Sequence, residues 1–366
     1  MISQSFTRPR FCLFYFPHGD DKVICTNEMR RATFTIMVLL QSAVLQSKGS
    51  PIAEKPLVTP TPFPASSMTA PKHLSEKNAT TPTLNSFLAP EGFGVVKLKQ
   101  KNFDIDPKRL VIDVAINRVS ATLEVDTGAG GIVIARASLK KFGLVEQKIP
   151  IRISIFGKKS ALNPFWSVAK LDSLVIGDSA IHAVPVGIKE IPHLDGLLGS
   201  PEMHSVGAVL DCVEPALYLP RRGFSSRTSE QLAAVLQTNG FTQVPLRLNS
   251  DHHLEVDCSI DGVSSTMLVD TGSRFTLIGE SIGTKAGIMM TRSTTEGTAW
   301  EGTPLSRGRV KKLGIGDFQI RDTDVYFVDL KKADHPSTYV LGIRELVSSF
   351  AVIDIGGLRM YLRHPQ

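Results

Sequence analysis

Short runs in which apolar and polar residues alternate, separated by turns that contain glycine, make up most of the chain after residue 95. Residues 110–128 read LVIDVAINRVSATLEVDTG, and residues 254–272 read LEVDCSIDGVSSTMLVDTG. A period of two is typical of strands that bury one face. The two segments align without a gap at an offset of 144 residues, and ten of their nineteen positions are identical. They therefore predict the same pair of strands, formed twice.

The repeat continues downstream of these two segments. Residues 171–188 and 310–328 each read as a strand, a Gly-Asp turn and a second alternating strand. Residues 196–219 and 339–362 follow, each with a strand that ends in glycine, a short helix and further apolar strand sequence. Short strands, tight turns and few helices predict a small, mainly β barrel in each copy.

This pattern places two lobes at residues 93–220 and 241–366, related by a pseudo-twofold axis with a cleft between them. The segment 221–240 joins them. It contains SEQLAAVLQTNG, with Ser229 as an N-cap, a glutamate in the first turn and a glycine at the end. These residues predict one connecting helix.

The first 92 residues do not read as domain sequence. Within residues 1–47, Met29-Arg30-Arg31 precedes the apolar run 32–46, a pattern typical of an export signal. The run is short for a membrane-spanning helix, and a tidy cleavage site is missing. We therefore expect an exported protein, periplasmic or secreted, or one tethered to a membrane by this segment, with Met1 or Met29 as its start. Residues 48–92 are rich in Pro, Ser and Thr and predict a disordered linker.

Composition narrows the choice of function without deciding it. The 366 residues carry a net charge of +6, and 42% are hydrophobic, as in ordinary globular proteins. Lys and Arg are spread along the chain, so no nucleic-acid partner is expected. The sequence contains no HExxH, no GxSxG and no phosphate-binding loop, which predicts no metal and no cofactor. Cys212 and Cys258 lie in apolar runs and are expected to be buried free thiols, with a disulfide between the lobes as the alternative for an exported chain.

The tripeptide Asp-Thr-Gly ends both copies of the repeated hairpin, at residues 126–128 and 270–272. Two such loops that meet would hold Asp126 and Asp270 too close for both to ionise, so the pair would share one proton. The ionised carboxylate can then activate water while the protonated carboxyl polarises a scissile carbonyl. The loops would be locked and shaped by the residues that follow each aspartate, Thr127, Gly128, Thr271 and Gly272.

Three elements occur at matching places in both copies: the strand that leads into Asp-Thr-Gly, a later Leu-Leu-Gly or Val-Leu-Gly at 197–199 and 340–342, and a short helix. In these elements the chain resembles the aspartic proteases, in particular their retropepsin-like branch. The resemblance implies two fused retropepsin-like units, each supplying one aspartate. It also implies an aspartic endopeptidase that acts on peptides or proteins as a pseudo-dimeric monomer.

The chain departs from that family after the glycine of each tripeptide. Gly130 and Arg274 stand where relatives often carry Ser or Thr. The Arg274 cation would favour an ionised dyad, unless it points outward or receives a substrate carbonyl. The segments 153–166 and 294–308 are candidates for flaps, and they contain the two tryptophans, Trp166 and Trp300, which line the substrate groove or merely cover the barrels.

Other functions remain open at this point. The same fold could bind peptides without cleaving them, or each lobe could pair with a second copy of the chain. Asp126 and Asp270 could also be structural turn residues, although a turn needs no downstream Leu-Gly partner. Asp211 and Asp354 also repeat, and we expect them to bind backbone at strand ends.

Overall fold

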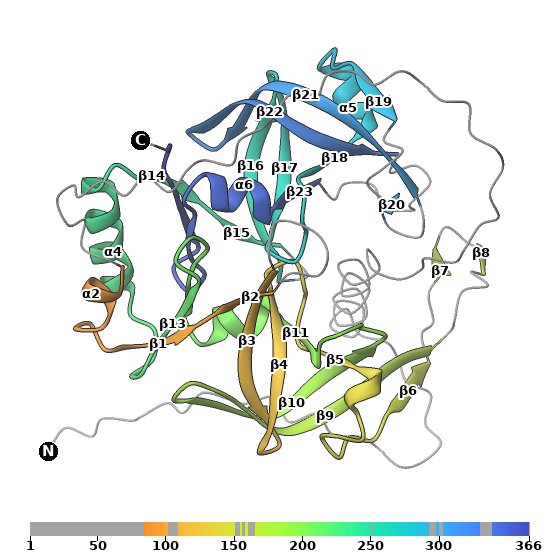
Figure 1. The fold of residues 1–366 in the computed structure, drawn as a ribbon, viewed down its shortest axis with the longest axis vertical. Coiled ribbons are helices and arrows are strands. Elements are labelled where there is room, and N and C mark those ends of the chain that lie inside the picture. Colours follow the sequence, from red (N-terminus) through yellow and green to blue (C-terminus); the bar gives the residue numbers. More distant parts are fainter. Residues whose placement is uncertain are drawn as a thin grey trace, which may run out of the picture.

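The computed structural model describes residues 84–101, 109–150, 154–155, 158–159, 165–249, 252–292, 298–299, 303–329 and 339–365. Most of these residues lie in β-strands, which form two closed barrels and a third sheet common to both halves (Figure 1). The predicted fold class, mainly β with two barrel lobes, is confirmed. The N-terminal segment 1–47 and most of the expected linker lie outside the described residues.

The first barrel, lobe 1, contains the hairpin predicted from residues 110–128. Its ring runs β3-β4-β11-β5-β10-β9, and pairing of β3 with β9 closes it. The strands are β2 (Lys99–Lys101), β3 (Arg109–Ile116), β4 (Val119–Asp126), β5 (Val133–Ala135), β6 (Gln147–Pro150), β9 (Phe165–Ile176), β10 (Ser179–Lys189) and β11 (Gly196–Gly199). A 3-10 turn, η2 (Arg136–Ser138), follows β5, and β7 (Ser154–Ile155) pairs with β8 (Lys158–Lys159).

The second barrel, lobe 2, repeats this ring as β16-β17-β23-β18-β22-β21, closed by the pairing of β16 with β21. Its strands are β15 (Arg247–Leu248), β16 (Leu254–Ile260), β17 (Val263–Asp270), β18 (Leu277–Gly279), β19 (Met290–Arg292), β20 (Thr298–Ala299), β21 (Thr303–Ile315), β22 (Phe318–Val328) and β23 (Tyr339–Gly342). The predicted Gly-Asp turns join β9 to β10 and β21 to β22. Gly177 and Gly316 take φ values of +54° and +53° there, which glycine adopts without a steric cost.

The third sheet joins the two halves of the chain. Its order is β1-β13-β12-β24-β25-β14, and β12 pairs with β24 where the halves meet. Its strands are β1 (Phe93–Lys97), β12 (Val209–Asp211), β13 (Ala216–Pro220), β14 (Thr242–Pro245), β24 (Val352–Asp354) and β25 (Arg359–Leu362). The helices are α2 (Leu84–Leu88), α3 (Ser200–Ser205), α4 (Ser226–Thr238), α5 (Glu280–Lys285) and α6 (Ile343–Ser348). In Figure 1, α2 and α4 lie together at the left, beside this sheet.

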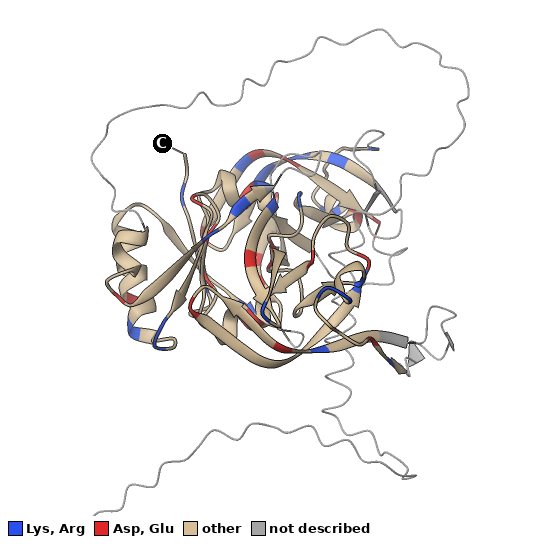
Figure 2. Ribbon diagram, turned by 60° about the horizontal axis from the view of Figure 1, so that its bottom comes forward, with Lys and Arg blue, Asp and Glu red and all other residues tan. Residues whose placement is uncertain are grey.

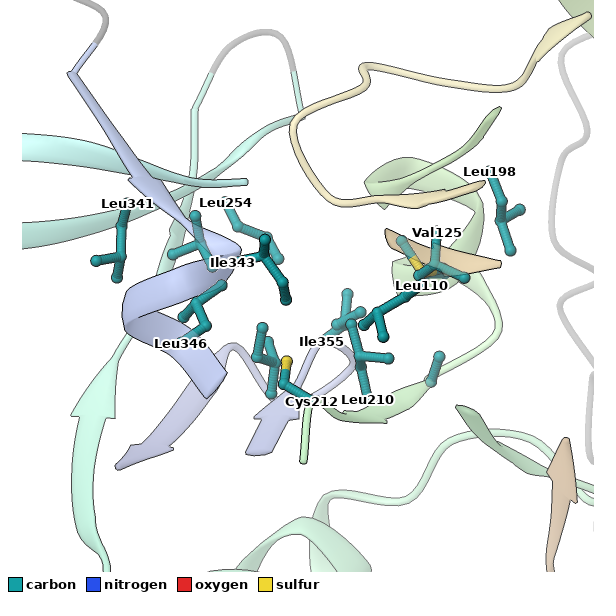
Figure 3. Packing of buried hydrophobic residues seen from close by; sticks show 14 of the residues in the cluster. Leu110, Val125, Leu198, Leu210, Cys212, Leu254, Leu341, Ile343, Leu346 and Ile355 are labelled. Atoms are coloured by element: carbon teal, nitrogen blue, oxygen red, sulfur yellow. The ribbon is translucent and has the colours of Figure 1, made fainter. Parts of the chain in front are cut away.

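One apolar cluster runs through both barrels and across the joint between them. Figure 3 shows Leu210, Cys212 and Ile355 between a lobe 1 group that includes Val125 and a lobe 2 group that includes Leu341. Cys212 and Cys258 are buried and unpaired, as predicted. Because the core is continuous, the two lobes are packed as one body around their joint.

Two local features differ from the sequence-based expectation. Regular structure is already present before Gly92, because α2 buries Leu88 in a second apolar cluster with Leu232 and Leu236 of α4. Helix α4 begins at Ser226 rather than after Ser229. Ser229 lies inside the helix and donates its hydroxyl to the carboxylate of Asp354, so a tertiary contact replaces the predicted cap.

Charged residues are interspersed over the barrels and the shared sheet (Figure 2). Within the described part of the chain, no helix is both long enough and apolar enough to cross a membrane. The apolar run 32–46, on which the expectation of a signal or anchor rests, is not part of it.

Candidate active site

The two Asp-Thr-Gly loops emerge from equivalent strands of the two barrels. Asp126 ends β4 and Asp270 ends β17. In each barrel the aspartate pairs in parallel register with the glycine of the downstream element, Gly199 on β11 or Gly342 on β23. The predicted supporting element therefore runs directly beside each catalytic-loop candidate.

The loops are locked together by a symmetric set of hydrogen bonds. The Thr127 hydroxyl donates to the carbonyl of Val269 at 2.7 Å, and the Thr271 hydroxyl donates to the carbonyl of Val125 at 2.7 Å. Each hydroxyl also accepts the amide of the opposite threonine, at 3.1 Å from Thr127 N and 3.0 Å from Thr271 N. All four groups are buried, so leaving any of them without a partner would be costly.

The interlock brings the two carboxyl groups face to face. A Cβ atom added at Gly128 would collide with the carboxyl group of Asp270, and one added at Gly272 would collide with that of Asp126. Each glycine thus makes room for the aspartate of the other lobe. The carboxyl groups are held by loop amides: Asp126 Oδ1 accepts Gly128 N at 2.9 Å, and Asp270 Oδ1 accepts Gly272 N at 2.9 Å and Ser273 N at 3.0 Å.

Burial and proximity disfavour charge on both carboxyl groups. Burial, followed by the negative charge of Asp126, raises the pKa of Asp270 well above its usual range. Burial also raises the pKa of Asp126, and hydrogen bonds from Asp270 and Gly128 and the positive charges of Arg109 and Lys189 oppose the rise. This arrangement therefore disfavours two negative charges in the site and favours a single proton shared by the two carboxyl groups.

The helix after each supporting strand anchors the chain just beyond the dyad. Ser200 N, at the start of α3, donates to the carbonyl of Ala129 at 3.0 Å. Ile343 N, at the start of α6, donates to the carbonyl of Ser273 at 2.8 Å. These bonds tie each loop to its own barrel, so the position of each aspartate is fixed from both sides.

The structure describes no contact of the two aspartates with the other predicted site residues, Arg274, Trp166 and Trp300. The guanidinium of Arg274 lies over the Phe275 ring, 4.3 Å from its centroid, and is not among the groups that shift the Asp270 pKa. Trp166 lies on β9 opposite Ile149, but the structure does not describe its side chain. Trp300 lies outside the described residues, as do eight of the fourteen residues of the flap candidate 153–166 and seven of the fifteen residues of 294–308.

A charged group beside Asp126 was missed by the sequence-based reasoning. Glu124 precedes Asp126 by two residues on β4, is 2% exposed, and binds Arg109 Nη1 at 2.8 Å. Lys189 ends β10 and acts on the Asp126 pKa. In the sequence, the one sign of this group is a glutamate at the end of an otherwise apolar strand. Its partner on β3 becomes apparent only when the register of β3 against β4 is known.

Two other repeated aspartates are structural, as predicted. Asp211 Oδ1 accepts the amides of Val213 and Glu214 at 2.8 and 3.0 Å, and Asp354 Oδ1 accepts the amide of Gly357 at 2.8 Å. No cluster of three or more His, Cys, Asp or Glu residues suited to a metal ion occurs among the described residues.

Two closed barrels joined by a shared sheet, each presenting one aspartate in an interlocked Asp-Thr-Gly loop, define the bilobal architecture of an aspartic protease. The family model described as aspartyl protease matches residues 112–201 and 256–344, once in each barrel. The chain belongs to this family and carries its unit twice.

Two solved structures of aspartic proteases are similar to parts of the chain. The aspartic proteinase from Irpex lacteus is 16% identical with a TM-score of 0.45, over 75% of this chain and 98% of that one. A retropepsin-like aspartic protease from Rickettsia conorii is 20% identical with a TM-score of 0.26, over 35% of this chain and 90% of that one. No curated protein sequence matches.

Proposed function

We propose that this protein is an aspartic endopeptidase in which Asp126 and Asp270 form the catalytic dyad. The observation that carries the proposal is the buried interlock of Thr127 and Thr271, which holds two carboxyl groups face to face under conditions where they share a proton. Family membership supports the same conclusion. Neither a metal nor a covalent nucleophile is required for this chemistry.

The reaction follows from the shared proton. The ionised carboxylate takes a proton from a water molecule as its oxygen attacks the peptide carbonyl, while the protonated carboxyl donates to the carbonyl oxygen. The gem-diol intermediate then collapses: the C–N bond breaks, the amine leaves with the proton that the first carboxyl took from water, and one diol hydroxyl returns its proton to the second carboxylate as the product acid forms. The dyad returns to its singly protonated state, so protons and charge balance over the cycle.

The remaining parts of the functional proposal concern substrate and setting. We propose that a peptide or protein substrate lies between the lobes, with Trp166, Trp300 and Arg274 as candidate groove residues and no cofactor. The functional unit is one chain, with lobe boundaries at residues 93–220 and 241–366. Residues 32–46 direct export or tether the protein to a membrane.

A peptide-library cleavage assay between pH 3 and 8 tests the activity. We expect cleavage that a statine-type inhibitor blocks. Asp126→Asn and Asp270→Asn should each lower kcat/KM by about 10²–10⁴-fold, because each removes one partner in proton transfer. Asp178→Asn, in an exposed hairpin turn, is the matched control and should leave kcat/KM unchanged.

Two results would favour other functions. If no peptide is cleaved, but peptides bind to the wild type and not to the dyad variants, the protein is a peptide-binding member of the fold. If light scattering shows that cleavage activity resides only in a dimer, the lobes act through a second copy. A monomer that cleaves peptides excludes both alternatives.

A further inference from the structure

The surroundings of the two aspartates differ in charge. Lobe 1 places Arg109, Glu124 and Lys189 near Asp126. At the 144-residue offset of the repeat, Arg109 corresponds to His253 and Glu124 to Leu268. Lys189 pairs with Ala135 as Val328 pairs with Gly279, so the counterpart of Lys189 is Val328. The three positions that carry ionisable side chains beside Asp126 in lobe 1 are therefore occupied in lobe 2 by one histidine and two aliphatic residues.

The counterparts in lobe 2 carry no charge at neutral pH. Leu268 and Val328 are buried, and Val328 belongs to an apolar cluster with Leu277 and Tyr326. Burial lowers the pKa of His253 to about 4, so this imidazole is neutral above that pH. The charge that acts on the Asp270 pKa is that of Asp126 itself.

The strand geometry directs the lobe 1 charges toward Asp126. Glu124 and Asp126 are two residues apart on β4, so their side chains leave the same face of the sheet. The register of β3 against β4 pairs Val111 with Glu124, which places Arg109 two residues further along, level with Asp126. Lys189 approaches from β10, and its charge and that of Asp126 act on each other.

We propose that Arg109, Glu124 and Lys189 form a polarising group that makes Asp126 the ionised member of the dyad and leaves the shared proton on Asp270. Its catalytic consequence rests on the proposed endopeptidase function: Asp126 takes the proton of the attacking water, and Asp270 donates to the substrate carbonyl. The assignment of the proton itself concerns the free protein and does not depend on turnover.

One contact favours the opposite assignment. Asp270 Oδ1 accepts two loop amides, whereas Asp126 Oδ1 accepts one. A neutral amide, however, also donates to the carbonyl oxygen of a protonated carboxyl, so the additional bond survives when Asp270 keeps its proton. A nearby full positive charge discriminates more strongly between the ionised and protonated forms, particularly away from water. The cations of lobe 1 therefore decide the assignment.

Acidic conditions reinforce this asymmetry. Burial raises the pKa of Glu124 to about 7 and lowers that of Lys189 to about 7. Below that pH, Glu124 takes up a proton, for which its buried Oε1 has no competing hydrogen-bond partner in the described structure, while Lys189 stays charged. The groups that face Asp126 from β3, β4 and β10 then have a net positive charge. From lobe 2, Asp270 faces Asp126 directly, and His253, which bonds the backbone of Gly128 and whose pKa burial lowers to about 4, stays neutral above that pH.

Carbon-13 NMR of aspartate-labelled full-length protein tests the assignment without requiring activity. Loss of a signal in Asp126→Asn or Asp270→Asn identifies the two carboxyl carbons. We expect the Asp126 carboxyl to titrate at lower pH than that of Asp270. In Lys189→Met the Asp126 midpoint should rise by about one pH unit, because one nearby positive charge is lost. Lys189→Arg should restore the wild-type midpoint.

The matched control is Val328→Met, at the equivalent position of lobe 2, which should leave the Asp126 midpoint unchanged. The proposal is overturned if Asp270 titrates first, or if folded Lys189→Met leaves both midpoints in place. If peptides are cleaved, the acid limb of the kcat/KM profile should move upward in Lys189→Met by the same amount. Absence of cleavage would defeat the endopeptidase proposal while the NMR titration still decides the assignment.

Discussion

The two lobes share their backbone hydrogen bonds and differ in the side chains around them. The interlock, the pairing of each aspartate with a glycine and the anchoring of each loop by a short helix occur in both halves. The cations that act on the pKa values of the dyad, Arg109 and Lys189, both come from lobe 1. Both copies have therefore kept the backbone and threonine hydrogen bonds that position the two carboxyl groups. The side chains that act on the pKa values of these carboxyl groups differ between the copies.

A second difference lies behind the loops. In lobe 2, buried Glu345 accepts the Thr276 hydroxyl at 2.6 Å and Arg344 Nε at 2.8 Å. Its counterpart Glu202 in lobe 1 has Ile132 and Pro201 at the matching positions, and its Oε2 has no partner in the described structure. The buried glutamate behind the lobe 2 loop is thus bonded by side chains, whereas Glu202 behind the lobe 1 loop is bonded by backbone amides and leaves Oε2 without a partner.

The largest expected effect comes from breaking what the lobes share. Thr127→Val removes one hydroxyl from the interlock and leaves the amide of Thr271 and the carbonyl of Val269 buried without that partner. We expect the free energy of unfolding to fall by about 2–4 kcal/mol. Thr271→Val should lower it by the same amount, because the bonding is symmetric. Urea denaturation at neutral pH measures both.

Thr238→Val is the matched control for these variants. Thr238 is exposed on α4, and its hydroxyl bonds only the carbonyl of Ala234 within the helix. Its loss should change the free energy of unfolding by less than about 0.5 kcal/mol. Unequal effects of Thr127→Val and Thr271→Val, beyond about 1 kcal/mol, would contradict a symmetric interlock.

Much of the fold could be predicted from the sequence, because the signals were local and occurred twice. Period-two runs and Gly-Asp turns mark the hairpins, and the repeated Asp-Thr-Gly marks the loops that the structure brings together. What escaped prediction depends on tertiary contacts. The α4 start shifts because Ser229 binds Asp354, and α2 orders because Leu88 finds a partner surface on α4. Arg109 meets Glu124 only through the register of two strands.

A smaller effect on the free energy of unfolding should distinguish Glu202 from Glu345, the glutamates behind the two loops. Glu202→Gln should stabilise the protein at pH 7, because burial raises the pKa of Glu202 from 4.5 to about 7. A raised carboxyl pKa means that the folded state binds the proton more tightly than the unfolded state. Glu202 therefore destabilises the protein progressively as pH rises from about 4.5 to 7, by an amount on the order of 3 kcal/mol.

Glu345→Gln serves as the paired variant and should have the opposite sign. It weakens charge-assisted bonds to Arg344 in a buried site, with an expected loss of about 1–3 kcal/mol. Chemical denaturation at pH 5 and pH 7 measures both variants. The decline in stability between these pH values should lessen in Glu202→Gln only, and an unchanged decline in that variant would show that Glu202 has found a partner in solution.

The smallest effect concerns a feature that both lobes share at their surface. Asp113 and Asp257 occupy equivalent positions and each form an exposed ion pair, with Lys99 and with Arg247. Asp113→Asn and Asp257→Asn should each lower the free energy of unfolding by at most about 0.5 kcal/mol in physiological salt, because solvent screens such pairs. Arg247 binds Asp257 through two nitrogens at 2.7 Å, so the Asp257 variant should show the larger of the two small effects.

Urea denaturation at 0.05 and 0.5 M NaCl measures the free energy of unfolding of both variants, and the difference between the variants should shrink at the higher salt concentration. A loss above about 1 kcal/mol that persists at high salt would show that one lobe relies on its surface pair, and the contrast between the lobes would then extend beyond the surroundings of the dyad.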